Sequence, residues 1–120
     1  PPPPEPVLRR TLTLEFSLDH HVGLVAPGAR FWVDLNHDDH ADDNERVRDV
    51  SQTDLTWTGT LKVPNTLRTV CVLVRYIAHR GATWTLRAAV DGRPIKTETG
   101  PVTDPVSWIV VHLDLQGDPR

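Results

Sequence analysis

The 120-residue sequence has no methionine, one cysteine and no long apolar run. The lone Cys71 has no partner for a disulfide within the chain, so cysteine usage indicates no redox compartment. No stretch approaches the roughly 18–20 consecutive apolar residues of a membrane helix, which excludes such a span. Because the sequence starts at Pro1 without a methionine, we expect an excised domain or a processed product of a longer protein.

Positive charge is spread along the chain without a cluster, whereas negative charge is concentrated in one place. The formal net charge is -3, and residues 34–49 hold seven acids against two arginines, a local charge of -5. The remaining nine acids and eleven bases are evenly mixed, and there is no global basic face. Nucleic-acid binding needs clustered Lys and Arg, so this composition disfavours it.

The organisation along the chain predicts a proline-rich linker at 1–6 and a single domain over 7–118. Prolines fix φ and remove backbone donors, which favours an extended polyproline stalk. After it, apolar and polar residues alternate with period two, the pattern of a half-buried strand. The alternation covers residues 8–18, 31–35, 55–63 and 84–90.

Two further stretches, 70–78 and 106–115, are apolar on both faces and predict central strands. Asp91-Gly92 is typical of a type I′ turn, so the strands on either side should form a hairpin, and Pro94 should make the second one an edge strand. Another turn is expected at Gly100-Pro101, ahead of the last strand. The predicted fold is all-β: an antiparallel β-sandwich of seven or eight strands, immunoglobulin-like or jelly-roll-like, with a small barrel as the alternative.

Residues 34–45, DLNHDDHADDNE, form the one motif with chemical content. Calcium takes about six to eight oxygen ligands, and a coiled twelve-residue loop offers them at positions 1, 3, 5, 7, 9 and 12. His40 would contribute its backbone carbonyl and Glu45 a bidentate carboxylate. The candidate metal ligands are Asp34, Asn36, Asp38, His40, Asp42 and Glu45.

This spacing resembles the calcium loop of EF-hands and is especially similar to the loop of dockerin modules, over these twelve residues only. The resemblance implies calcium as the cofactor. Position 6 holds Asp39 in place of the family's glycine, and position 8 holds Ala41 in place of an aliphatic residue. The flanks lack helices, so we expect a calcium loop grafted between two strands and not an EF-hand domain.

Two other interpretations of this segment stay open: an acidic loop that is simply solvated, or one that docks a basic partner. Its histidines, His37 and His40, lack the glutamate and helical context of a zinc protease motif. The sequence also has no nucleophile elbow, phosphate-binding loop or dinucleotide fingerprint, and Cys71 lies in an apolar strand. We therefore expect a non-catalytic protein.

The tryptophans suggest what the domain binds. Trp57 and Trp84 are in phase with the core positions of their strands, whereas Trp32 and Trp108 are out of phase and should point away from the core. They would either cover a sheet face or bind a ligand, since indole rings suit sugars and protein partners.

The sequence thus favours an interaction or spacer module of a larger protein, binding a protein partner or a polysaccharide. The alternatives are a carbohydrate-binding module, which sandwich, calcium loop and outward tryptophans together resemble, and a C2-like domain that binds lipid through calcium. We expect an extracellular or cell-surface location, because millimolar calcium there can fill a weak, imperfect loop.

Overall fold

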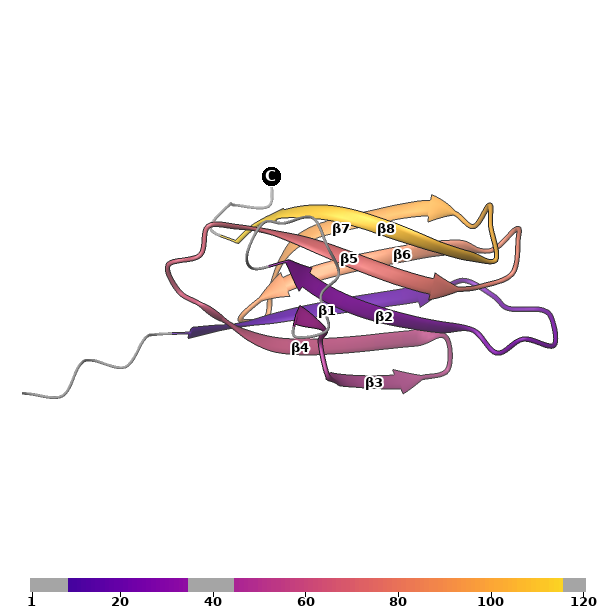
Figure 1. Ribbon diagram of the computed structural model, residues 1–120, viewed down its shortest axis with the longest axis horizontal. Helices are drawn as coiled ribbons and strands as arrows, with labels where there is room; N and C mark the ends of the chain where they lie inside the picture. Colours follow the sequence, from indigo (N-terminus) through magenta and orange to yellow (C-terminus); the bar gives the residue numbers. More distant parts are fainter. Residues whose placement is uncertain (1–8, 35–44, 116–120) are drawn as a thin grey trace, which may run out of the picture.

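The computed structural model describes residues 9–34 and 45–115, which form eight antiparallel strands in two sheets (Figure 1). The expected β-sandwich is confirmed, and the two separate sheets exclude a closed barrel. The strands are β1 (Arg9–Leu18), β2 (Gly28–Asp34), β3 (Asp49–Thr53), β4 (Thr56–Pro64), β5 (Thr69–Ile77), β6 (Thr83–Val90), β7 (Arg93–Pro101) and β8 (Val106–Asp114).

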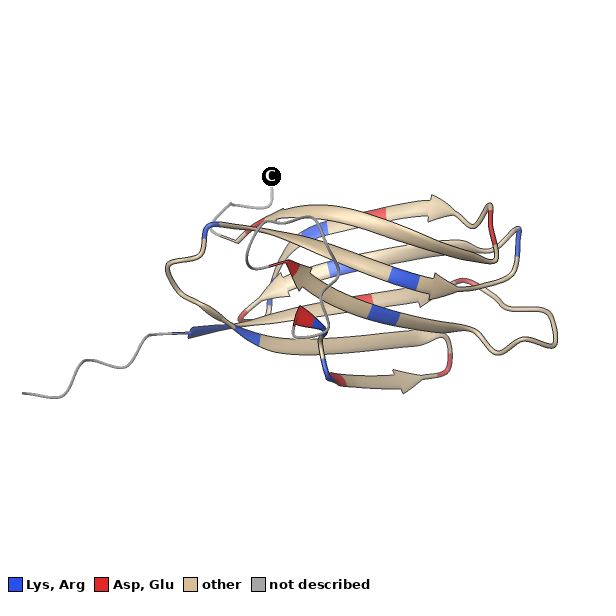
Figure 2. Ribbon diagram, in the orientation of Figure 1, with Lys and Arg blue, Asp and Glu red and all other residues tan. Residues whose placement is uncertain are grey.

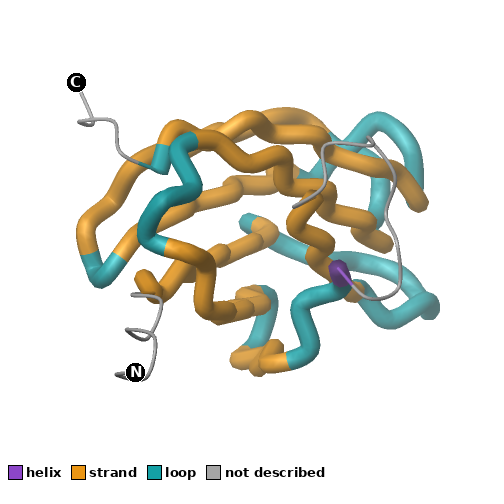
Figure 3. The backbone as a smooth tube through the Cα atoms, turned by 60° about the vertical axis from the view of Figure 1, so that its left-hand side comes forward, coloured by secondary structure: helices purple, strands orange, loops and turns teal. Residues whose placement is uncertain are grey.

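The larger sheet has the order β3-β4-β1-β6-β7, and the smaller one has the order β2-β5-β8. The two sheets face each other as layers, with most connecting loops at the two ends (Figure 3). Both halves of the chain therefore contribute to each layer, since β1 pairs with β4 and β6, and β2 pairs with β5.

The main core lies between the layers and is built by the period-two alternation. In β1 the side chains of Leu12, Leu14 and Phe16 are fully buried, while the intervening residues are only partly buried. Phe16 stacks on Tyr76 of β5 with ring centroids 5.5 Å apart, and Trp57 of β4 lies 6.0 Å away. This aromatic contact joins the two sheets at the centre of the sandwich.

The hairpin prediction is confirmed: β6 and β7 pair directly around Asp91-Gly92, which have φ values of 50° and 81°. Positive φ at both central residues is what a type I′ turn requires. β7 is an edge strand, as Pro94 predicted. The turn expected at Gly100-Pro101 is wrong in position, because β7 continues to Pro101 and Gly100 pairs with Trp84.

One central-strand prediction is confirmed and the other is wrong. β5 lies between β2 and β8, and its apolar residues on both faces are buried. β8 instead forms an edge of the three-stranded sheet, and its residues alternate between exposed and buried. The outer face of β8 is apolar, as a central strand would be, but it is not covered. Its residues Val106, Trp108 and Val110 are exposed. Strand β3 showed no alternation because all five of its residues are exposed or only partly buried.

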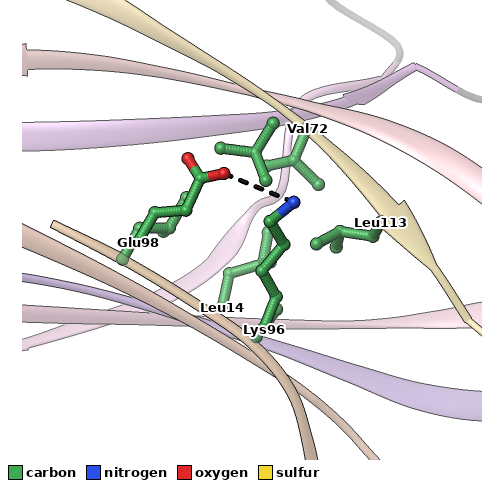
Figure 4. A pocket seen from close by; sticks show the side chains of 8 residues that line it. Leu14, Val72, Lys96, Glu98 and Leu113 are labelled. Carbon is green, nitrogen blue, oxygen red and sulfur yellow. Dashed lines mark ion pairs between the residues drawn. The ribbon is translucent and has the colours of Figure 1, made fainter. Parts of the chain in front are cut away.

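The side of the sandwich between β7 and β8 is closed by a polar pair. Lys96 and Glu98 of β7 form a 3.3 Å ion pair above Leu14, Val72 and Leu113 (Figure 4). The hollow beneath them is too small for a water molecule. The aliphatic part of each side chain thus seals the core while its charged end stays at the surface.

Candidate functional site

The outer face of the β2-β5-β8 sheet carries most of the residues that suit ligand binding. Alternation sends every second side chain of these strands away from the core, and the register aligns them in rows across the sheet. The rows are Arg30, Arg75 and Trp108; then Trp32, Leu73 and Val110; then Asp34, Cys71 and His112.

The two predicted ligand-binding tryptophans lie side by side on this face. Their ring centroids are 5.2 Å apart with an interplanar angle of 44°. Trp32 is 9% exposed and packs with Cys71 and Leu73 in a small cluster outside the main core, whereas Trp108 is 47% exposed. The predicted outward orientation of both is confirmed, but only Trp108 offers an indole surface to a ligand.

Two arginines on this face lie directly opposite each other on neighbouring strands. Arg30 of β2 is the register partner of Arg75 of β5, and both are exposed; they are the blue bands on these two strands in Figure 2. The guanidinium carbon of Arg75 lies 6.0 Å from the centroid of the Trp108 ring. Within the described parts of the chain, neither guanidinium forms an ion pair with a carboxylate. Directly opposed like charges are unfavourable for a sheet, and an anionic group between them would reduce that cost.

Open cavities extend this basic region around the edge of β2. Arg30, Arg75 and Gln52 line a cavity of about 400 Å³. Arg30 also lines a second cavity of about 320 Å³ together with Arg46 and Arg48. Sequence reasoning missed this cluster, because Arg30 and Arg75 are far apart in the chain and only the register brings them together.

The acidic loop begins and ends at buried carboxylates. Asp34 is fully buried and Glu45 is 8% exposed, and they are the two buried charged side chains of the described residues. Chain segments on either side of the loop meet in a β-bridge between Trp32 and Arg46, and the N–H of Val47 donates to the carbonyl of Phe31 over 2.9 Å. Antiparallel pairing next sets the backbone of Glu45 beside that of Val33, one residue before Asp34, so the two ends of the predicted loop lie at neighbouring backbone positions.

The other predicted ligands, Asn36, Asp38, His40 and Asp42, lie outside the described residues. Within residues 9–34 and 45–115, no group of three or more His, Cys, Asp and Glu side chains is arranged to hold a metal ion. Calcium binding therefore stays a prediction.

The opposite end of β2 has a different surface. Between β1 and β2, residues 22–25 expose Val22, Leu24 and Val25. Beside them the rings of His20 and His21 contact His79, with centroids 4.7 and 5.6 Å apart. This end carries apolar surface and histidines, and β2 separates it from the base of the acidic loop.

Asp19, which follows β1, is hydrogen-bonded to the start of β6 in the β6-β7 hairpin. Its carboxylate accepts a hydrogen bond from the Thr83 N–H over 2.7 Å, and a second contact of 2.9 Å comes from His20. The Thr83 hydrogen bond is the main reason that the pKa of Asp19 is lowered, with His20 adding to it, because both contacts favour the charged carboxylate.

Among the described residues there is no helix with the length and apolar character needed to cross a bilayer. No protein-family model matches the chain, and neither the curated proteins nor the solved structures contain a significant match. The fold therefore defines the class, an antiparallel β-sandwich, and function has to be argued from the surface.

Proposed function

We propose that this chain is a non-catalytic β-sandwich binding module whose binding surface is the outer face of the β2-β5-β8 sheet. The observation that carries the proposal is the row formed by Arg30, Arg75 and Trp108. Tryptophan and arginine are the side chains most enriched where binding energy concentrates in protein interfaces. Here they occur side by side and exposed.

The chemistry of the row indicates the kind of partner. A carboxylate or sulfate between Arg30 and Arg75 would relieve their repulsion, and guanidinium groups bind such anions through two parallel hydrogen bonds. The indole of Trp108 would supply apolar contact next to that anion. An acidic segment of a protein partner provides both elements, and it is our first choice.

A carbohydrate-binding module is the second candidate, favoured by the contact between Trp32 and Trp108. Sugar rings stack on exposed indoles, and an acidic sugar would also use the arginines. Only one of the two rings is substantially exposed, which ranks this candidate below a protein partner.

Arrays of acidic and neutral peptides and of acidic and neutral glycans test the surface directly. We expect the chain to retain acidic peptides, and Trp108→Ala and Arg75→Gln each to abolish the signal while circular dichroism shows that the variants remain folded. Arg93→Gln is the matched control, because it removes an exposed positive charge on β7 of the other sheet. Retention that all variants share, or no retention on either array, would contradict the proposal.

We also propose that residues 34–45 bind calcium and so stabilise the part of the sandwich next to the binding surface. Support comes from the ligand spacing of the segment and from Asp34 and Glu45, the buried carboxylates at its two ends. Seven acids lie within residues 34–49, and a bound cation would offset their mutual repulsion. An extracellular location follows from the same proposal, because a loop that departs from the EF-hand pattern needs millimolar calcium.

Calorimetric titration of the chelator-stripped chain with calcium, magnesium and zinc tests the loop. We expect heat with calcium that the double variant Asp34→Ala/Glu45→Ala abolishes. Because both residues are buried, Asp38→Asn/Asp42→Asn serves as a second variant that leaves the base intact. No heat with any of the three ions would leave a solvated acidic loop.

A C2-like lipid-binding function has less support. It needs calcium ligands and membrane-contacting apolar residues at the same end of the domain. Asp34 ends β2, whereas the exposed residues 22–25 precede its start at Gly28. Seven residues of strand, roughly 20 Å at 3.3 Å per residue, separate the two regions.

A further inference from the structure

The described part of the chain has four edge strands, and three of them carry features that prevent pairing with another chain. Unpaired edges are templates for strand addition, and proteins protect them by shortness, charge, proline or coverage. β3 is five residues long and contains Asp49, Ser51, Gln52 and Thr53. β7 contains Pro94, Lys96 and Glu98, and a bulge at Ala88/Ala89 disturbs its pairing with β6. The edge of β2 is occupied by the Trp32–Arg46 bridge.

The fourth edge, β8, is only half protected. The ammonium group of Lys96 on β7 donates to the carbonyl of His112 over 3.4 Å, so this carbonyl points away from β5. Odd-numbered positions point toward β5: the Leu115 N–H donates to Arg68, and the Pro105 carbonyl accepts from Ala78. Backbone direction alternates along a strand. Residues 106, 108 and 110 therefore present their N–H and C=O groups to the free edge. Among the described residues, no side chain contacts these groups in the way that Lys96 contacts the His112 carbonyl.

The side chains of the same three residues are apolar and exposed. Val106, Trp108 and Val110 are 49%, 47% and 54% exposed, and all three lie on the outer face of the sheet. An open backbone edge next to an apolar strip has the two elements that strand addition uses: main-chain hydrogen bonds and side-chain contacts.

We infer that this edge pairs with β8 of a second copy of the chain, antiparallel and centred on Trp108. In that register Trp108 lies opposite Trp108 of the second copy, and Val106 lies opposite Val110. All three pairs are apolar, none brings like charges together, and all three use backbone groups that point outward. The strip is thus complementary to itself, which is the requirement for a two-fold interface.

A register centred on Val110 is less favourable. Centring the pair on Val110 would place Trp108 opposite His112 and would require the His112 carbonyl that Lys96 already contacts. Val106 would then face the carboxylate of Asp114. The Trp108-centred register leaves both Lys96 and Asp114 outside the interface.

Such a dimer would join two three-stranded sheets into one continuous six-stranded sheet. The row of Arg30, Arg75 and Trp108 would continue into the same row of the second copy, which doubles the surface proposed above for an anionic partner. The pairing itself depends on the edge alone and not on that function.

Sedimentation equilibrium over a range of concentrations tests the pairing in the whole chain. We expect a monomer–dimer equilibrium, and Val110→Lys should raise the dimer dissociation constant by at least about tenfold, because it puts charge on the strip. Ser51→Lys is the matched control, since it adds the same charge at an exposed position on β3, an edge strand of the other sheet, and it should leave the constant unchanged. Arg30→Gln should also leave it unchanged, because Arg30 lies on β2 and β5 separates it from β8, and this variant distinguishes the inference from the proposed function.

Cysteine cross-linking tests the register. In the Trp108-centred pair, Trp108→Cys should form a disulfide-linked dimer on oxidation, because directly opposed strand residues lie within disulfide range. Val106→Cys and Val110→Cys should each fail alone and should cross-link when combined. A chain that stays monomeric at every concentration would overturn the inference, as would binding of an extended foreign peptide to a monomer, or dimers that only Val110→Cys cross-links.

Discussion

The indole ring of Trp84 on β6 lies directly over Gly100, its register partner on β7. A Cβ atom built on Gly100 would lie 2.7 Å from Cζ2 and 2.8 Å from Cε2 of that ring, closer than side chains approach one another. The glycine is therefore needed for the close approach of the ring, which packs against the main core and covers the end of the β6-β7 hairpin.

Gly100→Ala should lower the free energy of unfolding by about 1–3 kcal/mol, because the new methyl group forces the ring or the strand to move. Urea denaturation measures this loss. Gly28→Ala is the control: a Cβ there meets nothing within 4 Å, and we expect a change within about 0.5 kcal/mol. Equal effects of the two substitutions would contradict the packing argument.

Phe16 joins the two sheets through its contacts with Tyr76 and Trp57. Phe16→Ala should cost about 3–5 kcal/mol, because a fully buried ring leaves a cavity between two layers that are held apart by other side chains. Urea denaturation with circular dichroism gives the value. A loss below about 1 kcal/mol would mean that the layers close over the gap.

Arg30 and Arg75 repel each other across β2 and β5, so removing one charge should stabilise the fold. We expect Arg30→Gln to raise the free energy of unfolding by up to about 1 kcal/mol at low salt, and by less at 1 M salt, where screening weakens the repulsion.

Arg87→Gln is the matched control, because Arg87 forms a 3.1 Å ion pair with Glu15 and gains nothing from losing its charge. Both partners of that pair are well exposed, so the effect should be small. Stabilisation by Arg87→Gln to the same degree would show that total positive charge matters and not the opposed pair.

Asp19 should make stability depend on pH. Its pKa in the folded state is lowered, so its charge contributes stability above the ordinary aspartate pKa of 3.8, and this contribution is lost as the pH falls through the lowered value. Asp19→Asn keeps an acceptor for the Thr83 N–H but does not titrate.

The variant should therefore unfold at a lower temperature than the parent at pH 6, and the difference should shrink as the pH approaches about 2. Thermal unfolding across this range measures it. Asp104→Asn, on the exposed loop before β8, controls for the loss of one negative charge. A difference that stays constant with pH would contradict the role of the carboxylate charge.

Much of the fold was predictable because period-two alternation is a local property. Leu12, Leu14 and Phe16 had to share a face, and Asp91-Gly92 had to turn the chain, whatever surrounded them. The alternation also predicted that Trp32 and Trp108 point away from the main core. It failed for β8, where an apolar outer face at Val106 and Val110 suggested a central strand that proved to be an edge.

The candidate site was less predictable, because it depends on which strands become neighbours. The acidic motif at residues 34–45 is local, so its ligand spacing could be recognised from the sequence alone. No sequence pattern predicts that Arg30 lies opposite Arg75. Nor does any pattern predict that Lys96 of β7 contacts the backbone of β8.

By itself, the sequence determined the all-β class, most strand positions, the hairpin and the acidic segment, because each follows from the stereochemistry of residues close together in the chain. Only the tertiary structure decided the strand order β2-β5-β8, and with it the row of Arg30, Arg75 and Trp108 and the open edge at residues 106–110. Strand order is set by how the two layers bury their apolar faces against each other, which involves the whole chain at once.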